Sequence, residues 1–301
     1  MRTWVGVPVL LSSLVVAAPA TAAVVPATSG GNKVSFSSDA ASDTIAVTCG
    51  GGQVRANGGP GILPCADLIE IEVYGNGGVD QLDVSAVTRA AFPKLVETEL
   101  DGGPGADDVT GSPLNDGVTG DGEDTIATGE GDDRIAKGKT VSAGAGNDLL
   151  TDVPSGSDAG AGDDRMTAPE GTGPWVGGPG SDELSFSLDA APAIDLKLAL
   201  TDDAMRLEAQ GGMTDFSIPS VEQIALVMPN GGKQTIDASA FDGSITVDGR
   251  DGDDTLIGGG LDDVLRAAPA TTRSPAGAAP TCSTPGPATT PSGRGTRDPT
   301  G

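Results

Sequence analysis

The sequence predicts an all-β fold in which short strands stack on one another, and composition is the first reason. The chain has 301 residues, with 43 Asp and Glu against 17 Lys and Arg, a net charge of −26 and only 3% aromatic residues. So few aromatic side chains cannot fill a large conventional core. A stack of repeats avoids this need, because each turn buries a few aliphatic side chains against its neighbours.

A nine-residue repeat is the second reason. Residues 102–110 (GGPGADDVT) and 177–185 (GGPGSDELS) fit the pattern G-G-x-G-x-D-x-U-x, where U is apolar. The glycines permit a tight turn, the Asp supplies a hard anionic oxygen, and the apolar residue enters a strand. Looser copies centre on Asp116, Asp124, Asp133, Asp148, Asp164, Asp254 and Asp263. The recurring apolar position favours a folded stack over a disordered acidic segment.

Over roughly residues 100–185 and 247–266 the chain resembles the RTX, or hemolysin-type, calcium-binding repeat family. The resemblance implies a right-handed parallel β-roll or β-helix solenoid with degenerate nonapeptide turns, and Ca²⁺ as the bound ion. Its ligands would be Asp carboxylates and the carbonyl groups of glycine turns. The candidate residues are Gly102, Gly103, Gly105, Asp107, Asp116, Asp124, Asp133, Asp148, Asp164, Gly177, Gly178, Gly180, Asp182, Asp254 and Asp263.

The spacing of the Asp residues predicts two unequal edges. Consecutive turns of a β-roll face opposite edges, so residues about eighteen positions apart share one edge. One column would contain Asp116, Asp133, Asp148, Asp164 and Asp182. The other begins with Asp107 and Asp124, and then Lys137 and Lys139 stand where ligands are expected. We expect several ions on the first edge and about one on the second. Turns that have merely shifted register are the alternative.

The region 230–234 repeats this loss of an acidic ligand, with Gln234 at the position expected for Asp, and we expect that turn to hold no metal. Strand alternation and glycine-rich turns divide the rest of the chain. The expected units are β-rich rungs over 23–100, an RTX-like β-roll over 101–185, longer rungs over 186–246 and further RTX-like repeats over 247–266.

The first 22 residues indicate a secretory signal peptide. Arg2 precedes an apolar run over 5–18, and Ala20-Thr21-Ala22 fits a cleavage site. The run is short for a membrane span, so we expect an extracellular protein that does not insert into a membrane. A retained N-terminal anchor is the alternative.

The cysteines follow from this compartment. In an oxidising environment Cys49 and Cys65 are expected to form a disulfide that bridges a glycine-rich stretch. The crosslink would contribute about 3 kcal/mol by restricting the unfolded chain. Two unpaired thiols are the alternative. Cys282 lies in the segment 267–301.

That segment changes abruptly to Ala, Pro, Thr, Ser and Arg. It is either a disordered linker or the product of a frameshift. In a reading frame shifted by one base, each new codon consists of the third base of one codon and the first two bases of the next. The protein sequence leaves most third bases undetermined. If they are chosen to suit, the codons of residues 267–293 read GGAGDDTLA, GGGGADVLD and AGAGDDTLG. These three nonapeptides continue the phase of the repeats that end at Arg266.

Charge and residue types limit the function. The chain has no His, which excludes Ser-His-Asp catalysis and His-ligated zinc. Its acidity argues against nucleic acid as a partner and favours divalent cations. We expect a secreted, non-enzymatic calcium-binding protein with a structural or adhesive role, whose further partner would be a cell-surface or matrix component. A β-helix polysaccharide lyase or glycosidase, with calcium as a structural or catalytic ion, is the alternative.

Overall fold

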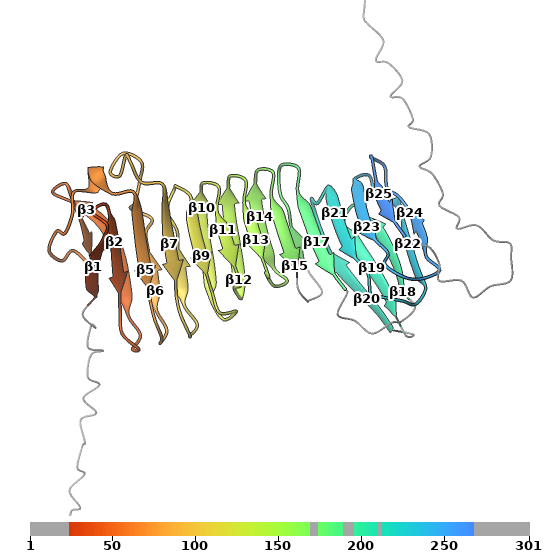
Figure 1. The fold of residues 1–301 in the computed structure, drawn as a ribbon, viewed down its shortest axis with the longest axis horizontal. Helices are drawn as coiled ribbons and strands as arrows, with labels where there is room; N and C mark the ends of the chain where they lie inside the picture. The colour runs from red at the N-terminus through yellow and green to blue at the C-terminus, as the bar shows by residue number, and fades with distance from the viewer. Residues whose placement is uncertain (1–23, 169–173, 189–195, 210–211, 268–301) are drawn as a thin grey trace, which may run out of the picture.

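The computed structural model describes residues 24–168, 174–188, 196–209 and 212–267 (Figure 1). These residues are nearly all β-strand, with one short 3₁₀ helix, η1 (Cys65–Asp67). The predicted all-β class is therefore confirmed. The predicted signal peptide and residues 268–301 of the tail lie outside the described residues. No helix in the described part is long and apolar enough to cross a membrane.

A twelve-stranded sheet, here called the long sheet, runs along the molecule (Figure 1). All its neighbouring strands are parallel except the first pair, which is antiparallel. In spatial order the strands are β1 (Val25–Ser29), β2 (Lys33–Ser37), β5 (Glu70–Tyr74), β7 (Glu97–Asp101), β9 (Asp116–Thr119), β11 (Arg134–Ala136), β13 (Leu149–Thr151), β15 (Arg165–Ala168), β17 (Glu183–Ser187), β21 (Gln223–Val227), β23 (Ser244–Asp248) and β25 (Val264–Arg266).

Two further sheets complete the fold. The eight-stranded one, here called the short sheet, contains β16 (Trp175–Val176), β14 (Ser157–Ala161), β12 (Thr140–Ala145), β10 (Thr125–Glu130), β8 (Asp108–Thr110), β6 (Gln81–Asp83), β3 (Thr44–Gly50) and β4 (Gln53–Ala56). The third contains β20 (Gly212–Ser217), β19 (Ala204–Ala209), β18 (Leu196–Thr201), β22 (Gln234–Ala240) and β24 (Thr255–Ile257). From β5 to β17 the chain alternates between the long and short sheets, so each turn lies on the one before it.

The apolar position of the repeat builds the core between the sheets. Ile135, Leu150, Met166 and Leu184 are each at most 1% exposed, and they pair in register along the long sheet. Ile126 and Val141 do the same in the short sheet. Full burial of one such side chain stabilises the fold by about 1.5–3 kcal/mol. The stack therefore gains its stability in small, repeated amounts.

Residues 186–246 depart from the expected run of longer rungs. β18, β19 and β20 form an antiparallel meander, which joins the rest of its sheet through parallel pairing of β18 with β22. The alternating burial of β18 indicates a strand, but not the direction of its neighbour. The meander brings Phe216 against Trp175 and Phe186, with ring centroids 6.3 and 5.9 Å apart.

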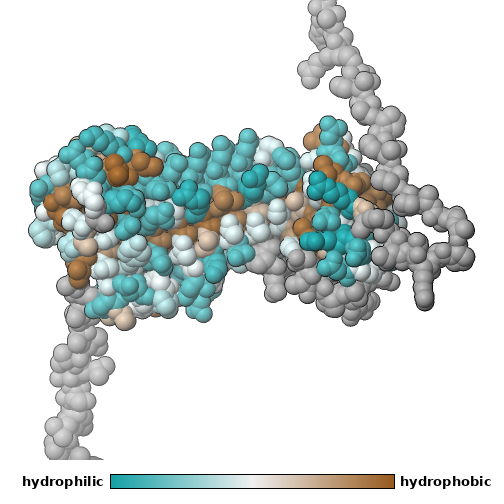
Figure 2. Space-filling model, in the orientation of Figure 1, coloured by the Kyte–Doolittle hydropathy of each residue, from teal (hydrophilic) through white to brown (hydrophobic). Residues whose placement is uncertain are grey.

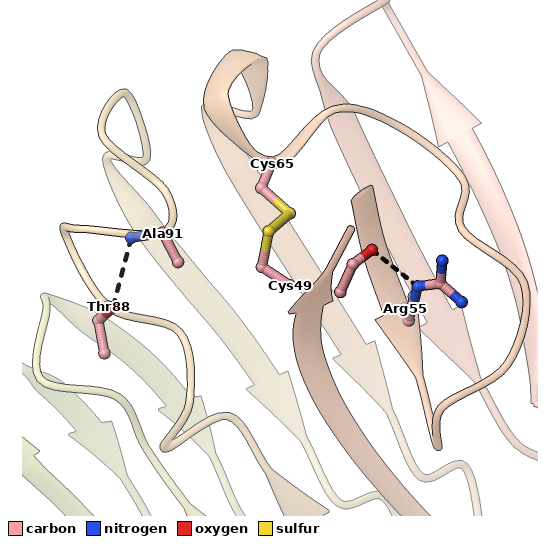
Figure 3. Close-up of a disulfide and its surroundings, with 6 residues drawn as sticks. Cys49, Arg55, Cys65, Thr88 and Ala91 are labelled. Carbon is pink, nitrogen blue, oxygen red and sulfur yellow. Dashed lines mark hydrogen bonds between the residues drawn. A yellow bond between two sulfur atoms is a disulfide. The ribbon is translucent and has the colours of Figure 1, made fainter. Parts of the chain in front are cut away.

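The N-terminal end of the stack finishes in two antiparallel hairpins. β1 folds back along β2, and β4 folds back along β3. The disulfide between Cys49 and Cys65, whose Cα atoms are 6.1 Å apart, holds this second hairpin to η1 (Figure 3). Nearby, the Arg55 guanidinium donates to the carbonyl oxygens of Gly50 and Gly59, both at 2.9 Å. The predicted disulfide is confirmed.

Candidate functional site

The predicted column of five Asp residues is present as a continuous ladder, here called the long-edge ladder. Its members are at most 2% exposed. Each main-chain N–H donates to Oδ1 of the Asp one coil further on, at 2.8–2.9 Å. The order is Asp116, Asp133, Asp148, Asp164 and Asp182. At the far end, the N–H of Asp182 donates to Oε2 of Glu222 at 2.9 Å.

A second ladder, the short-edge ladder, is longer than the sequence predicted. The N–H of Asp80 donates to Oδ1 of Asp107 (2.7 Å), and that of Asp107 donates to Asp124 (2.9 Å). Before them, the N–H of Asp43 donates to Asp80 at 2.7 Å. Sequence reasoning missed Asp43 and Asp80. The stretch 75–82, GNGGVDQL, carried a signal, since it places Asp and an apolar residue as a degenerate repeat would.

The short-edge ladder loses its carboxylates after Asp124. The N–H groups of Lys139 and Thr140 donate to the main-chain oxygen of Asp124, at 2.7 and 3.2 Å. Because Thr140 pairs with Thr125, Lys139 occupies the place of the next Asp, as the spacing predicted. Further along this edge, residues 169–173 lie outside the described residues.

At Gln234 a side-chain amide stands where other turns have an Asp carboxylate. Its N–H donates to Oδ1 of Asp254 at 3.0 Å, so its main chain takes part like that of an Asp. Its side-chain amide donates to the carbonyl oxygen of Gly231 at 2.7 Å. An amide N–H thus satisfies a turn carbonyl without a cation. Asp263, in the last repeat, accepts from the N–H of Ile245 at 2.9 Å.

A third row of side chains lies beside the long-edge ladder and was not predicted. Its members stand one residue before the ladder Asp, and their carboxylate or amide oxygens accept from the next coil at 2.8–3.2 Å. They are Asn115, Asp132, Asn147, Asp163 and the terminal donor Ser181. In the ladder, an N–H donates to the following coil, whereas in this row the N–H of the following coil donates to the preceding one. Neighbouring coils are therefore joined by hydrogen bonds in both directions.

The second carboxyl oxygen, Oδ2, distinguishes the ladders from an ordinary hydrogen-bond network. In five members Oδ2 is buried with no hydrogen-bond partner among the described residues: Asp80, Asp107, Asp148, Asp164 and Asp182; Oδ2 of Asp254, in a later turn, is buried in the same way. An unsatisfied buried carboxylate oxygen is costly, because burial removes its hydration. These oxygens therefore call for a proton, a water molecule or a cation.

Burial has a corresponding effect on the acidity of the ladders. It raises the pKa of Asp116 and Asp148 to about 7 and that of Asp107, Asp133 and Asp182 to about 6. The pKa of Asp80, Asp124, Asp164 and Asp254 is raised for the same reason. Main-chain N–H donors partly offset burial, whereas neighbouring carboxylates add to it. Without a cation these groups resist ionisation.

Glycine at the first position of the repeat leaves space where oxygens converge. A Cβ at Gly111 would lie 2.5 Å from Oδ2 of Asp116 and 2.6 Å from the carbonyl oxygen of Thr128. Gly177 lies in the same way beside Asp182 and the carbonyl of Ser220. Gly75 and Gly249 repeat the arrangement with Asp80 and Asp254. At Asp148 and Asp164 the buried methyl groups of Ala143 and Ala159 stand at this position instead.

The remaining predicted glycines let consecutive turns approach closely. A Cβ at Gly103, Gly105, Gly178 or Gly180 would overlap a carbonyl oxygen of the preceding coil. Gly102 faces Oδ2 of Asp107. The turns thus bring carboxylate and carbonyl oxygens together. Oxygen ligands suit a hard cation such as Ca²⁺ better than Zn²⁺.

This donor set requires most ligands to be main-chain atoms. Within the described ranges, no three His, Cys, Asp or Glu side chains form a group that could hold a metal. Ca²⁺ takes six to eight oxygens. A turn can meet this number only if carbonyl groups join one or two carboxylates, and glycine turns present such groups. The residues present therefore fit calcium on this condition.

Comparisons with known proteins give little further guidance. No protein-family model matches the chain. No solved structure matches it. Thaumatin-like proteins 1b and 1a of Malus domestica are each 46% identical over 57 residues, which is 19% of this chain. The matched part spans 26% and 22% of the two relatives, so this chain covers only about a quarter of their length. Similarity of this extent does not assign a family.

Proposed function

We propose that the chain is an exported RTX-type calcium-binding repeat protein with a structural or adhesive role and no enzymatic activity. Its long and short sheets would form a right-handed β-roll. The observation that supports this most strongly is the set of buried Oδ2 atoms without hydrogen-bond partners. Several lie beside a glycine and a carbonyl oxygen of the next coil.

Calcium would supply the positive charge that the ladders lack. Without it, ionised carboxylates would be buried one coil apart, and the glycine-rich turns would lose much conformational entropy on folding. Ion binding would therefore be coupled to folding. Dissociation constants of about 10⁻⁴–10⁻³ M would suffice outside the cell.

Export would follow from the same coupling. In the cytosol, where calcium is scarce, the chain would stay loosely folded, and the predicted signal peptide would direct it out of the cell. Outside, the ion would complete the stack. The ordered sheet faces then offer surface to a cell-surface or matrix component. Separating cells from medium would distinguish a released protein from an attached one.

A polysaccharide lyase or glycosidase remains a second candidate because of one cluster. On the outer face of the long sheet Glu70 pairs with Glu97, and Glu72 with Glu99. Arg134 reaches Glu97 at 2.8 Å and Glu99 at 3.7 Å, beside a hollow of about 270 Å³. Paired carboxylates are the groups that glycoside hydrolysis uses.

The pKa values of two carboxyl groups in this cluster are shifted upward, which is the direction that a general acid needs. Burial and a hydrogen bond with Glu70 raise the pKa of Glu72, and burial raises that of Glu99. Incubation with pectate or alginate, with detection of unsaturated and reducing products, tests this candidate. Product formation that is lost in Glu99→Gln would favour the enzyme over the structural role.

Circular dichroism tests the leading proposal. The mature chain is compared in EGTA, in millimolar calcium and in millimolar magnesium. We expect β-structure to increase with calcium and much less with magnesium, which rarely accepts a site built mainly of protein oxygens. A variant with Asp182→Asn should need more calcium, because Oδ2 of Asp182 lies beside Gly177 and the carbonyl oxygen of Ser220. Identical spectra in EGTA and calcium would contradict the proposal.

A further inference from the structure

The two ends of the stack are finished differently. At the N-terminal end, the outermost strands β1 and β4 run antiparallel to their neighbours, so the parallel repeat stops there. At the C-terminal end, β24 and β25 are the outermost strands of their sheets, and no described strand pairs with their outer edges. Ile257, Leu261 and Val264 are 36%, 61% and 44% exposed there. Apolar surface is visible at this end in Figure 2. An uncovered apolar edge is a template for another strand.

The last two repeats also carry incomplete ladders. Asp254 and Asp263 accept from the preceding coil through Oδ1, as ladder members do. Elsewhere a ladder Asp also donates its own N–H to a carboxylate one coil further on, for example from Asp164 to Asp182, 18 residues away. No described residue follows Asp254 or Asp263 in that position. Oδ2 of Asp254 is buried without a hydrogen-bond partner in the described part.

The codons of residues 267–293 can supply what this edge lacks. In the shifted frame they permit GGAGDDTLA, GGGGADVLD and AGAGDDTLG, in phase with 249–257 and 258–266. The sixth-position Asp of the first two would come 18 residues after Asp254 and Asp263. Their TLA and VLD segments would come 18 residues after β24 and β25. Both offsets match the coil that separates Asp164 from Asp182.

We propose that the open edge formed by β24 and β25 docks three further nonapeptide turns, which the codons of residues 267–293 encode in the shifted frame. The first turn would pair with β24 and the second with β25. Their apolar residues would cover Leu256 and Leu265, and their Asp residues would continue both ladders. The partner of this surface is therefore a segment from the same gene. The proposal concerns the end of the stack and does not require that calcium binds the central turns.

A chimera tests the docking. Residues 267–293 are replaced by GGAGDDTLAGGGGADVLDAGAGDDTLG, and hydrogen exchange is measured in calcium. A control carries the same 27 residues in permuted order. We expect exchange in β24 and β25 to slow about tenfold or more in the chimera relative to the control, since strand pairing protects edge amides. Equal exchange in the two proteins would overturn the proposal.

Two further readouts separate the outcomes. Exchange in β11 and β13 reports whether the central part of the stack depends on calcium. The calcium-binding function can therefore fail while docking succeeds, and docking can fail while calcium binding succeeds. Nucleotide sequencing across codons 264–293 tests the source of the segment. A frame that encodes the three nonapeptides supports the proposal. Its absence from both alternative frames would overturn it.

Discussion

The two edges of the stack use the same main-chain pairing with different side chains. Along the long edge, five Asp residues follow without interruption from Asp116 to Asp182. Along the short edge, the series stops at Asp124, and Lys139 takes the next place. The strands nevertheless continue to pair in register, β10 with β12 and β12 with β14.

Stacking of the main chain therefore does not require a carboxylate in each turn. Gln234 makes the same point, since its amide donates to the Gly231 carbonyl while its main chain keeps its ladder bond. A carboxylate whose second oxygen is buried would be a costly choice for stacking alone. Our proposal therefore assigns these carboxylates to cation binding, and the long edge offers the longer uninterrupted series of them.

The largest effect is expected from glycines at equivalent turn positions on the two edges. A Cβ at Gly146 would overlap the carbonyl oxygen of Gly131, whereas one at Gly122 would meet nothing within 4 Å. Both have positive φ, so backbone strain is shared. We expect Gly146→Ala to cost about 3–5 kcal/mol and Gly122→Ala about 1–2 kcal/mol. Urea unfolding in calcium, followed by Trp175 fluorescence, measures the difference; equal losses would contradict close stacking on the long edge.

The next effect concerns calcium affinity. Asp182→Asn keeps an oxygen that accepts from the Asp164 N–H but removes the charge. Asp124→Asn is the matched change on the short edge, where Oδ2 already accepts from the Asp121 N–H. We expect Asp182→Asn to weaken calcium binding about tenfold, equal to about 1.4 kcal/mol, and Asp124→Asn to weaken it less. Isothermal titration calorimetry measures both, and the reverse order would argue against a cation role for the long edge.

The third effect is a pH dependence whose sign depends on calcium. The folded pKa of the buried Asp residues is raised to about 6–7, so the metal-free fold binds more protons than the unfolded chain. The stability that these groups contribute to the metal-free fold is greatest below pH 4 and is lost as pH rises through 6–7. We expect the Tm in EGTA to fall by about 5 °C or more from pH 5 to pH 8.

Calcium should remove this fall, because the ion stabilises the ionised carboxylates. Thermal unfolding at matched pH with and without calcium checks the prediction. A Tm in EGTA that rises from pH 5 to pH 8 would show that the ladders do not hold protons in the metal-free fold.

The smallest effect is expected from restoring an acidic residue on the short edge. Lys139→Asp would extend the series after Asp124, so we expect a modest increase in calcium bound, by at most about one ion. Lys137→Asp is the control, because it changes the charge of the same turn outside the ladder position. Calorimetric stoichiometry measures the gain. An equal gain in both variants would assign it to net charge alone.

The sequence was sufficient to predict the all-β class, the disulfide and the order of the long-edge ladder. The apolar position and the Asp recur with a period that leaves little freedom once consecutive turns alternate between sheets. Asp43 and Asp80 were missed because their turns depart from the glycine pattern. The third row through Asp132 and Asp163 was missed because polar residues beside a turn are expected to be solvated.

The meander and the antiparallel hairpins at the N-terminal end could not be derived in the same way. Burial along β18 alternates as it would in any half-buried strand. The direction of its partner depends on the Asp202-Asp203 turn and on the packing of Phe216 in β20 against Trp175 and Phe186. These are tertiary contacts that a repeat pattern does not contain. The raised pKa values likewise depend on burial, which spacing does not specify.

A crystal structure grown in calcium, with anomalous diffraction data, tests the central claim most directly. The account predicts anomalous density along the long edge, close to Oδ2 of Asp182, where Gly177 leaves space beside the carbonyl oxygen of Ser220. It predicts none at the turns of Lys139 and Gln234. An ordered stack with these oxygens bound only to water or protons, at saturating calcium, would contradict it.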